Sequence, residues 1–235
     1  MELETQICAG QGREHCCLQL VRKNEMNIEG GIATAKKKGQ QVNGDVFSAI
    51  HLGKGQELIC LCDGMGSGSA AAETASAASR LIQLFFEAGF EPNQVIPMVN
   101  RILSVRTKEV FAAVDLCLVD LVQGYCQMIK TGAAPSWIIR NGIAESITAP
   151  ALPIGIVEDV RPGIIERSIE PGDTIVLLSD GIADLMTPEE LPKWLGQVEQ
   201  APTAAVAAEK LLAMARKRAE GRDDMTAVVL RMKKR

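Results

Sequence analysis

Acidic residues flanked by small residues recur at four places in the chain: Gly44-Asp45, Asp63-Gly64, Asp180-Gly181 and Asp223-Asp224. Asp63 and Asp180 each end a strongly apolar run, and Asp223 precedes another. An isolated carboxylate is costly to bury, so several that converge from different strand ends favour a cation between them. Oxygen ligands are those that hard divalent cations prefer, and the glycines allow backbone or substrate to approach closely. The pattern therefore predicts a metal site built from carboxylates.

Asp-Gly dipeptides are also common in turns, so a set of ordinary turn residues is the alternative interpretation.

The sequence gives little support to other kinds of catalytic site. His15 and His51 are the two histidines and lie far apart in sequence, which argues against a Ser-His-Asp or Cys-His site. The 7 cysteines show no paired Cys-x-x-Cys spacing, so neither a zinc site nor a disulfide framework is indicated. Chemistry that needs carboxylates and a divalent cation remains.

The bulk composition indicates one globular domain. The chain has 235 residues, of which 47% are hydrophobic and 23% charged, enough for a substantial core. Its net charge of −4 predicts no nucleic-acid partner and no contact with an anionic membrane. No apolar run approaches the roughly 20 residues that span a bilayer, and the N-terminus lacks a signal-peptide core. We expect a cytoplasmic chain with buried free thiols, or the cytosolic domain of a longer membrane protein.

Hydrophobic periodicity predicts the elements that must position the acidic residues. Helices are expected at residues 69–87, 92–105, 188–198 and 204–219. Strands are expected at 18–23, 27–36, 45–52, 57–62, 112–121, 125–130, 136–140, 143–147, 161–169, 173–179 and 225–232, with a bulge at Gly30-Gly31 and a hairpin turn at Asn141-Gly142. Residues 1–16 are expected to form a flexible or peripheral lead-in, and residues 17–235 one domain. Many hairpins and few helices favour an α+β layered domain with mostly antiparallel sheets.

The loop from Gly64 to Gly68 follows a predicted strand and opens a predicted helix, as phosphate-binding loops do. It lacks the Gly-Lys-Ser/Thr ending of a Walker A loop. A dinucleotide-binding fingerprint would require a crossover to a parallel strand, whereas two consecutive helices are expected next. Nucleotide binding is therefore disfavoured.

The order of the motifs resembles a known family, the PPM-type metal-dependent serine/threonine phosphatases. The matching segments are Gly44-Asp45, Cys62 to Gly68, Leu178 to Ile182 and Asp223 to Thr226. Lys130 to Ser136 and Ala151 to Ile156 are similar to the bacterial regulatory branch, and most of all to the C-terminal phosphatase domain of the stage II sporulation protein E (SpoIIE) family. The resemblance runs from about Asn27 to the C-terminus. It implies an α-β-β-α sandwich of two mostly antiparallel sheets flanked by helices.

The resemblance also implies roles for individual residues. Asp63 matches the carboxylate that bridges two metal ions, and the carbonyl of Gly64 matches a ligand of one of them. Asp45 matches a ligand of that same ion, partly through water. Asp180 and Asp223 match ligands of the other ion. The expected catalytic residues are therefore Asp45, Asp63, Asp180 and Asp223.

Two positions depart from the pattern of the eukaryotic relatives. Asp224 stands where they carry Asn. Asp223 and Asp224 are both candidate metal ligands, and we favour Asp223 as the ligand and Asp224 as a residue that supports it. The relatives also carry a phosphate-binding arginine near the first motif, and this chain has none there. Lys36, Lys38 or Arg222 are candidates to replace it, although a lysine-rich loop is often no more than a solvated one.

The chemistry of the residues agrees with this resemblance. Hydrolysis of phosphate monoesters is extremely slow without a catalyst and needs strong electrostatic help. Two cations about 3.5–4 Å apart can hold a water, lower its pKa and neutralise phosphoryl oxygens. Ligands that are all oxygen favour two Mn²⁺ or Mg²⁺ ions over zinc.

The resemblance finally implies a substrate and partners. It implies hydrolysis of phosphoserine on a small regulatory protein, a phosphorylated anti-sigma-factor antagonist, whose dephosphorylation activates a sporulation sigma factor. A stress-response phosphatase of the same branch is the runner-up. A non-catalytic module that binds a partner is the alternative from another class, and the complete set of acidic motifs argues against it. A homodimer through the helices after the metal loop is also expected.

Overall fold

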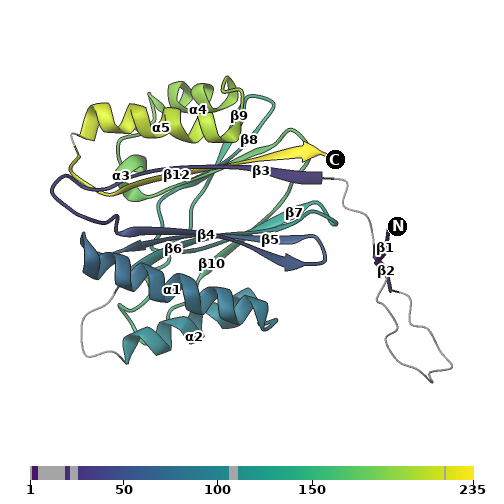
Figure 1. Cartoon of the computed structure of the whole chain (residues 1–235), viewed down its shortest axis with the longest axis horizontal. Helices are drawn as coiled ribbons and strands as arrows, with labels where there is room; N and C mark the ends of the chain where they lie inside the picture. The colour runs from purple at the N-terminus through teal and green to yellow at the C-terminus, as the bar shows by residue number, and fades with distance from the viewer. Residues whose placement is uncertain (1, 5–18, 22–25, 106–110, 220) are drawn as a thin grey trace.

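Two antiparallel sheets lie face to face, and helices cover the outer face of each sheet (Figure 1). The computed structural model describes residues 2–4, 19–21, 26–105, 111–219 and 221–235. Every strand pair within the two large sheets is antiparallel. The predicted α-β-β-α sandwich of the α+β class is confirmed.

The first sheet has the strand order β10-β7-β6-β5-β4. Its strands are β4 (Asp45–Gly53), β5 (Gln56–Gly64), β6 (Ala112–Asp120), β7 (Tyr125–Thr131) and β10 (Gly163–Ser168). The central strand β5 is a continuous apolar run because helices cover one of its faces and the second sheet covers the other.

The second sheet has the order β3-β12-β11-β8-β9. Its strands are β3 (Met26–Ala35), β8 (Ser136–Arg140), β9 (Ile143–Ile147), β11 (Thr174–Leu178) and β12 (Met225–Lys234). The predicted turn between β8 and β9 is confirmed. Asn141 and Gly142 both have positive φ, 51° and 77°, as a type I′ hairpin requires.

The helices form the two outer layers. α1 (Ser69–Glu87) and α2 (Pro92–Ser104) cover the first sheet, and α4 (Leu191–Glu199) and α5 (Ala204–Ala219) cover the second (Figure 1). α3 (Asp180–Ala183) is a short turn of helix directly after β11. Within the described ranges, no helix combines the length and the apolar character that crossing a bilayer requires.

The layers enclose three apolar clusters. One lies between the sheets around Met128 and Val228. The second lies under α1 and α2 around Ile96, and the third lies under α4 and α5 around Trp194. The predicted buried thiols are confirmed for the described cysteines, which are free and buried: Cys60, Cys62, Cys117 and Cys126.

Three expectations need correction or fall outside the description. β3 pairs with β12 without a register shift from Met26 to Ala35, so the predicted bulge at Gly30-Gly31 is wrong. A Cβ at Gly31 would lie 2.2 Å from the backbone of Ala204, so this glycine lets the start of α5 pack against the strand. The expected helix at 188–198 begins only at Leu191. Residues 5–16 of the expected lead-in lie outside the described residues, whereas β1 (Glu2–Glu4) pairs with β2 (Gln19–Val21).

Candidate metal centre

Strand register brings two of the acidic residues side by side. Asp45 begins β4 and pairs directly with Asp63 near the end of β5. Directly opposed residues of an antiparallel pair point to the same face, so both side chains lie on one face at the same end of the first sheet. The aspartates are 18 positions apart in the chain, and the β4–β5 hairpin closes that separation.

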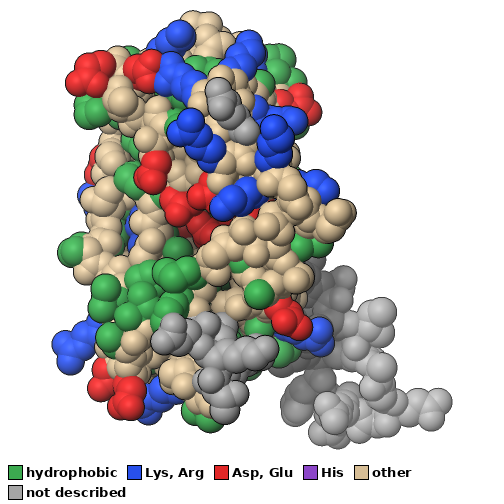
Figure 2. All heavy atoms as spheres, turned by 90° about the vertical axis from the view of Figure 1, so that its left-hand side faces the viewer, with side chains coloured by type: hydrophobic (Ala, Val, Ile, Leu, Met, Phe, Trp, Pro, Cys, Tyr) green, Lys and Arg blue, Asp and Glu red, His purple; other side chains and the backbone are tan. Residues whose placement is uncertain are grey.

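The other acidic positions lie at the corresponding end of the second sheet. Asp180 follows β11 and opens α3, and Asp223 and Asp224 precede β12. Because β11 and β12 are antiparallel, with Leu178 opposite Ala227, the end of one strand meets the start of the other. Figure 2 shows acidic side chains gathered in the middle of this face, with Lys and Arg side chains above them. All four acidic motifs therefore meet at one end of the sandwich, and we call this group of residues the acidic centre.

Two glycines make this arrangement possible. A Cβ at Gly64 would lie 2.0 Å from the carbonyl oxygen of Ala71, so any larger residue would push α1 away from the end of β5. A Cβ at Gly181 would lie 2.0 Å from the carbonyl oxygen of Asp224. The close backbone approach predicted at these glycines is therefore a packing contact, with α1 at Gly64 and with the Asp223-Asp224 segment at Gly181.

The gathered carboxyl groups raise one another's pKa. Burial, followed by the charges of Asp45 and Asp180, raises the pKa of Asp63 to about 9. Burial, followed by the charge of Asp223, raises the pKa of Asp180. Carboxylates that oppose one another's ionisation in this way create a strongly negative site once they lose their protons.

Asp45 is the most isolated of these groups. Its residue is 9% exposed, and neither of its carboxylate oxygens has a hydrogen-bond partner within the described parts of the chain. Burial, together with the charges of Asp224 and Asp180, raises its pKa to about 6. The neighbouring hydroxyls of Thr226 and Ser179 lower it, although neither makes a hydrogen bond of ordinary length and angle with the carboxylate. A buried carboxylate without partners is unusual and calls for a ligand.

The donor set fits a hard divalent cation. Oxygen is the ligand type that Mg²⁺ and Mn²⁺ prefer, and this end of the sandwich offers only oxygen among the predicted ligands. The oxygens are those of the unpartnered Asp45 carboxylate, the carboxylates of Asp63, Asp180 and Asp223, and the Gly64 carbonyl. In the described ranges, no three Asp, Glu, His or Cys side chains already enclose a single point as a finished metal site would.

Asp224 has a different role from the other acidic residues. It is 4% exposed, and its Oδ1 and Oδ2 accept hydrogen bonds from the backbone N–H groups of Lys37 and Gly44, at 2.8 and 3.0 Å. The carboxylate thus fastens the loop before Asp45 to the start of β12. This geometry suits the expected supporting residue better than the candidate metal ligand that the sequence also allowed.

The two neighbouring aspartates should respond differently to substitution. Asp223→Asn is expected to lower phosphatase activity far more than Asp224→Asn, because Asp223 has carboxylate oxygens to offer a cation. Asp224→Asn replaces one acceptor by a donor, leaves a buried N–H unpaired and should cost about 1–3 kcal/mol of stability. For a chain of this size that lowers the melting temperature by several degrees, at about 2–4 °C per kcal/mol. Activity and thermal unfolding measured on both variants test this. A larger loss of activity in Asp224→Asn than in Asp223→Asn would assign the metal ligand to Asp224.

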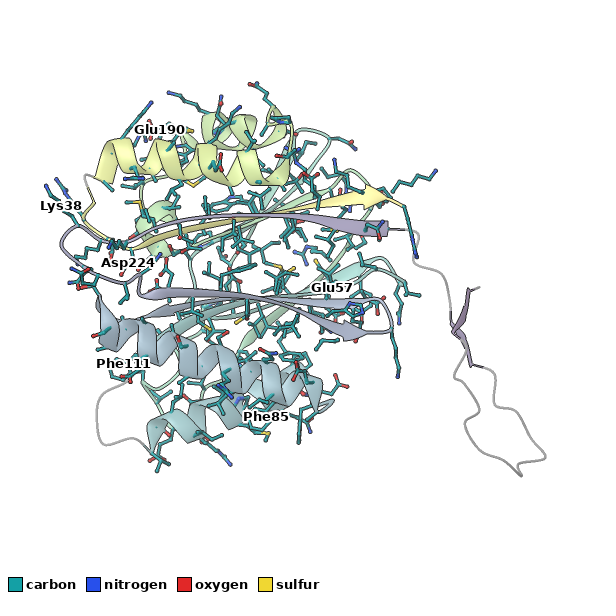
Figure 3. All side chains as sticks on the ribbon, in the orientation of Figure 1. Lys38, Glu57, Phe85, Phe111, Glu190 and Asp224 are labelled. Carbon is teal, nitrogen blue, oxygen red and sulfur yellow. The ribbon has the colours of Figure 1, made fainter. Side chains whose placement is uncertain are left out.

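A basic pocket of about 300 Å³ opens beside Asp223. Its charged lining includes Lys36 and Lys38, two of the predicted phosphate-binding residues, and Lys38 and Asp224 lie at the same end of the sandwich (Figure 3). Arg222 does not line this pocket, and Arg216 from the last turn of α5 does. Arg216 carried no signal in the sequence, because basic residues at helix C-termini are commonly explained by the helix dipole.

The metal-free protein is expected to lose stability as pH rises from about 4 to about 9. Unfolded aspartates ionise near pH 4, whereas the folded pKa values are about 9 for Asp63 and about 6 for Asp45. Between these values the folded state binds more protons than the unfolded state, so the free energy of unfolding falls with rising pH. Thermal unfolding of chelator-treated protein across this range measures the slope.

The Asp63→Asn variant is the control for this pH dependence. It should lack the part of the slope that the raised pKa of Asp63 produces, which extends to about pH 9. Titrating groups outside the four acidic motifs are shared and cancel in the comparison. Equal slopes for the variant and the wild type would contradict the raised pKa of Asp63.

Comparisons with known proteins identify the family. The family model for stage II sporulation protein E (SpoIIE) matches residues 53–233. Stage II sporulation protein E of Priestia megaterium is 30% identical over 181 residues, which cover 77% of this chain and 31% of the relative. Phosphoserine phosphatase RsbU of Bacillus subtilis (strain 168) is 25% identical over 153 residues, 63% of this chain and 45% of RsbU. The chain thus spans less than half the length of these relatives.

Solved structures agree with this assignment. The structure of the PP2C phosphatase domain and a fragment of the regulatory domain of SpoIIE from Bacillus subtilis has a TM-score of 0.79 at 28% identity, covering 89% of this chain and 63% of that one. The catalytic domain of the serine/threonine protein phosphatase PstP, in complex with 2 manganese ions, has a TM-score of 0.72 at 17% identity and covers 88% of this chain and 99% of its own. That second likeness concerns the fold. The chain belongs to the SpoIIE family and has the fold of its PP2C-type phosphatase domain.

Proposed function

We propose that the chain is a Mn²⁺- or Mg²⁺-dependent phosphatase that hydrolyses phosphoserine on a protein. The observation that carries the proposal is the convergence of acidic residues from both sheets on one end of the sandwich, with a buried Asp45 carboxylate that lacks a protein partner. Family membership supports it, since RsbU is named a phosphoserine phosphatase and the similar fold of PstP holds manganese ions.

The residues divide into two sets of ligands for two ions. Asp63 would serve both ions, joined by Asp45 and the Gly64 carbonyl for one. Asp180 and Asp223, from the second sheet, would hold the other. The cations, when bound, would supply the positive charge and the activated water that phosphate ester hydrolysis requires. Because the ligands come from opposite sheets, the sandwich itself sets the spacing between the two sets.

The basic pocket beside Asp223 would bind the substrate phosphate, the role of the arginine that eukaryotic relatives carry near the first motif. Lys36, Lys38 and Arg216 offer positive charge next to the acidic centre, which suits a phosphate that must approach clustered carboxylates. Arg216 is the strongest candidate among them, because a guanidinium binds phosphate oxygens in pairs.

Arg216→Gln is expected to raise the KM for a phosphoserine protein about tenfold or more and to change kcat less. Losing a charge-assisted hydrogen bond costs about 1.5–3 kcal/mol, and loss of uniform substrate binding appears in KM. Lys217→Gln is the matched control, since Lys217 is the next residue of α5 and does not line the pocket. Steady-state kinetics on both variants gives the answer, and equal KM values in wild type and Arg216→Gln would remove Arg216 from the site.

The proposed substrate is a small regulatory protein, a phosphorylated anti-sigma-factor antagonist, whose dephosphorylation would activate a sporulation sigma factor in the cytoplasm. The identity to a SpoIIE protein, 30%, is higher than the identity to the phosphoserine phosphatase RsbU, 25%, and favours this substrate over that of the runner-up, a stress-response phosphatase. The chain would act alone or as the cytosolic part of a longer protein. A homodimer through α1 and α2 stays a prediction, supported by exposed apolar side chains there: Leu84, Phe90 and Ile102.

The decisive experiment is phosphate release from a purified phosphoserine antagonist protein, with Mn²⁺ and without it. Rapid release with Mn²⁺ from the phosphorylated antagonist and slow release from a phosphothreonine variant of it would support the proposal. Tight binding of the phosphoprotein with no release under any metal condition would instead identify a non-catalytic binding module.

A further inference from the structure

A lysine with no solvent exposure lies between the two sheets. Lys130 on β7 is 0% exposed, and its Nζ donates hydrogen bonds to Asp115 Oδ2 at 2.6 Å and to Ser136 Oγ at 2.8 Å. Ser136 Oγ donates to the same Asp115 Oδ2 at 2.5 Å. We call these three residues the buried network. Asp115 and Lys130 pair on β6 and β7 of the first sheet, whereas Ser136 begins β8 of the second, so the buried network joins the two layers.

Stability of the core does not by itself account for this network. Desolvating two charges offsets much of their attraction, and apolar residues of similar volume often stabilise a core as well or better. The surrounding positions between the sheets are in fact apolar, including Met128 and Ile138. An ion pair placed in such a layer calls for a role that apolar residues cannot fill.

The buried network lies one step deeper in the sandwich than the acidic centre. Asp63 pairs with Ala113 of β6, and Asp115 is two residues further along that strand, on the same face. Such diagonal neighbours lie about 7–8 Å apart, too far for direct contact between carboxylates and suitable for one bridging molecule.

A small cavity occupies the space between them. Its volume is about 30 Å³, and its lining includes Asp63, Asp115 and Asp180. Asp115 is 2% exposed, and its Oδ1 has no hydrogen-bond partner among the described residues. Both bonds of the buried network go to Oδ2, so Oδ1 is the oxygen left for the cavity. A polar cavity of this size holds one water and is too small for a phosphate group.

We propose that the buried network positions the metal-binding carboxylates through a single water in this cavity. Lys130 and Ser136 fix the orientation of Asp115, and the water donates one hydrogen to Asp115 Oδ1 and the other to Asp63 or Asp180. Asp115, Lys130 and Ser136 are positioning residues, since none of them would touch the phosphate. The inference rests on the proposed metal-dependent function. Groups that orient metal ligands typically contribute 10–100-fold to metal affinity.

The test measures binding of Mn²⁺ alone by calorimetry, together with thermal unfolding. The main variant is the double substitution Asp115→Leu with Lys130→Met, which removes both charges and keeps an apolar filling. Its Mn²⁺ affinity is expected to fall about 10–100-fold, with a melting temperature near that of the wild type. Wild-type affinity in this variant would overturn the inference.

A second variant covers the case in which the double variant does not fold. Ser136→Ala keeps the ion pair and removes one bond to Asp115 Oδ2, so Mn²⁺ affinity is expected to fall severalfold, and no change would overturn the inference. A high-resolution crystal structure of the wild type should show a water between Asp115 and Asp63 or Asp180. An empty cavity there would also count against it.

A matched control comes from the far end of the second sheet. Arg140→Gln breaks the pair between Arg140 and Asp173, a carboxylate that is 2% exposed and precedes β11, whereas Asp180 follows that strand. This variant should lose thermal stability and keep wild-type Mn²⁺ affinity. A wild type that binds no Mn²⁺ would contradict the proposed function. A wild type that binds Mn²⁺, with a double variant that binds it equally well, would contradict only the role of the buried network.

Discussion

Replacing Asp63 with Asn is expected to lower the turnover of a phosphoserine substrate about a thousandfold or more. Asp63 pairs with Asp45 and interacts with Asp180, so it is the carboxylate placed to serve both proposed ions. Losing its charge would weaken the binding of both cations, which would supply several kcal/mol of transition-state stabilisation. Each 1.36 kcal/mol of lost stabilisation lowers the rate tenfold. The measurement is kcat at saturating Mn²⁺.

The fold of the Asp63→Asn variant should survive the substitution. In the absence of metal its melting temperature near pH 8 is expected to exceed that of the wild type. The folded wild type must keep the Asp63 carboxyl protonated at a pH where the unfolded chain ionises it, and asparagine carries no such cost. Asp159→Asn is a suitable control, since Asp159 is exposed and belongs to none of the four acidic motifs. Activity of Asp63→Asn within threefold of wild type would show that Asp63 is not a ligand.

Removal of divalent cations is expected to abolish activity, and Mn²⁺ should restore it. The ligands available at the acidic centre are carboxylates and a carbonyl, and the described residues there include neither a histidine nor a cysteine that would take over the chemistry. Ca²⁺ should restore less activity than Mn²⁺, because its larger radius and higher coordination number suit two neighbouring sites poorly.

The measurement is phosphate release after treatment with a chelator, followed by titration with each cation. Asp180→Asn should need more Mn²⁺ for half-maximal activity than the wild type does, which ties the cation requirement to the second sheet. Full activity in excess chelator would refute the metal-dependent mechanism.

Local patterns were enough to predict most of the elements. The Asn141-Gly142 dipeptide predicted the hairpin of β8 and β9 residue for residue, because a type I′ turn depends on two adjacent residues that tolerate positive φ. The bounds of α1 follow from an Ala-rich periodic run that ends before Gly89. Motif order, which also depends on the sequence alone, predicted the family and the α-β-β-α fold.

Long-range packing explains where the sequence misled. Gly30-Gly31 suggested a bulge, yet Gly31 serves the close approach of α5, an element more than 170 positions away. Arg222 was a candidate for phosphate, yet Arg216 lines the basic pocket, because the end of α5 and the loop before β4 come together only in the folded chain. A local pattern carries no information on which distant segment will pack against it.

The acidic centre shows the same division most clearly. Inspection of the sequence was enough to make Asp45, Asp63, Asp180 and Asp223 candidates for one site, because carboxylates at the ends of buried strands need compensation. Their arrangement became visible in the folded chain, where Asp45 faces Asp63 across a strand pair and Asp224 accepts hydrogen bonds from backbone amides. The buried Lys130 and its partner Asp115 likewise come together through strand pairing. A charged residue next to an apolar run can be recognised from the sequence, because burying its charge is costly in any fold. Its partners depend on strand register and on the packing of the two sheets, which involve residues distant in the sequence.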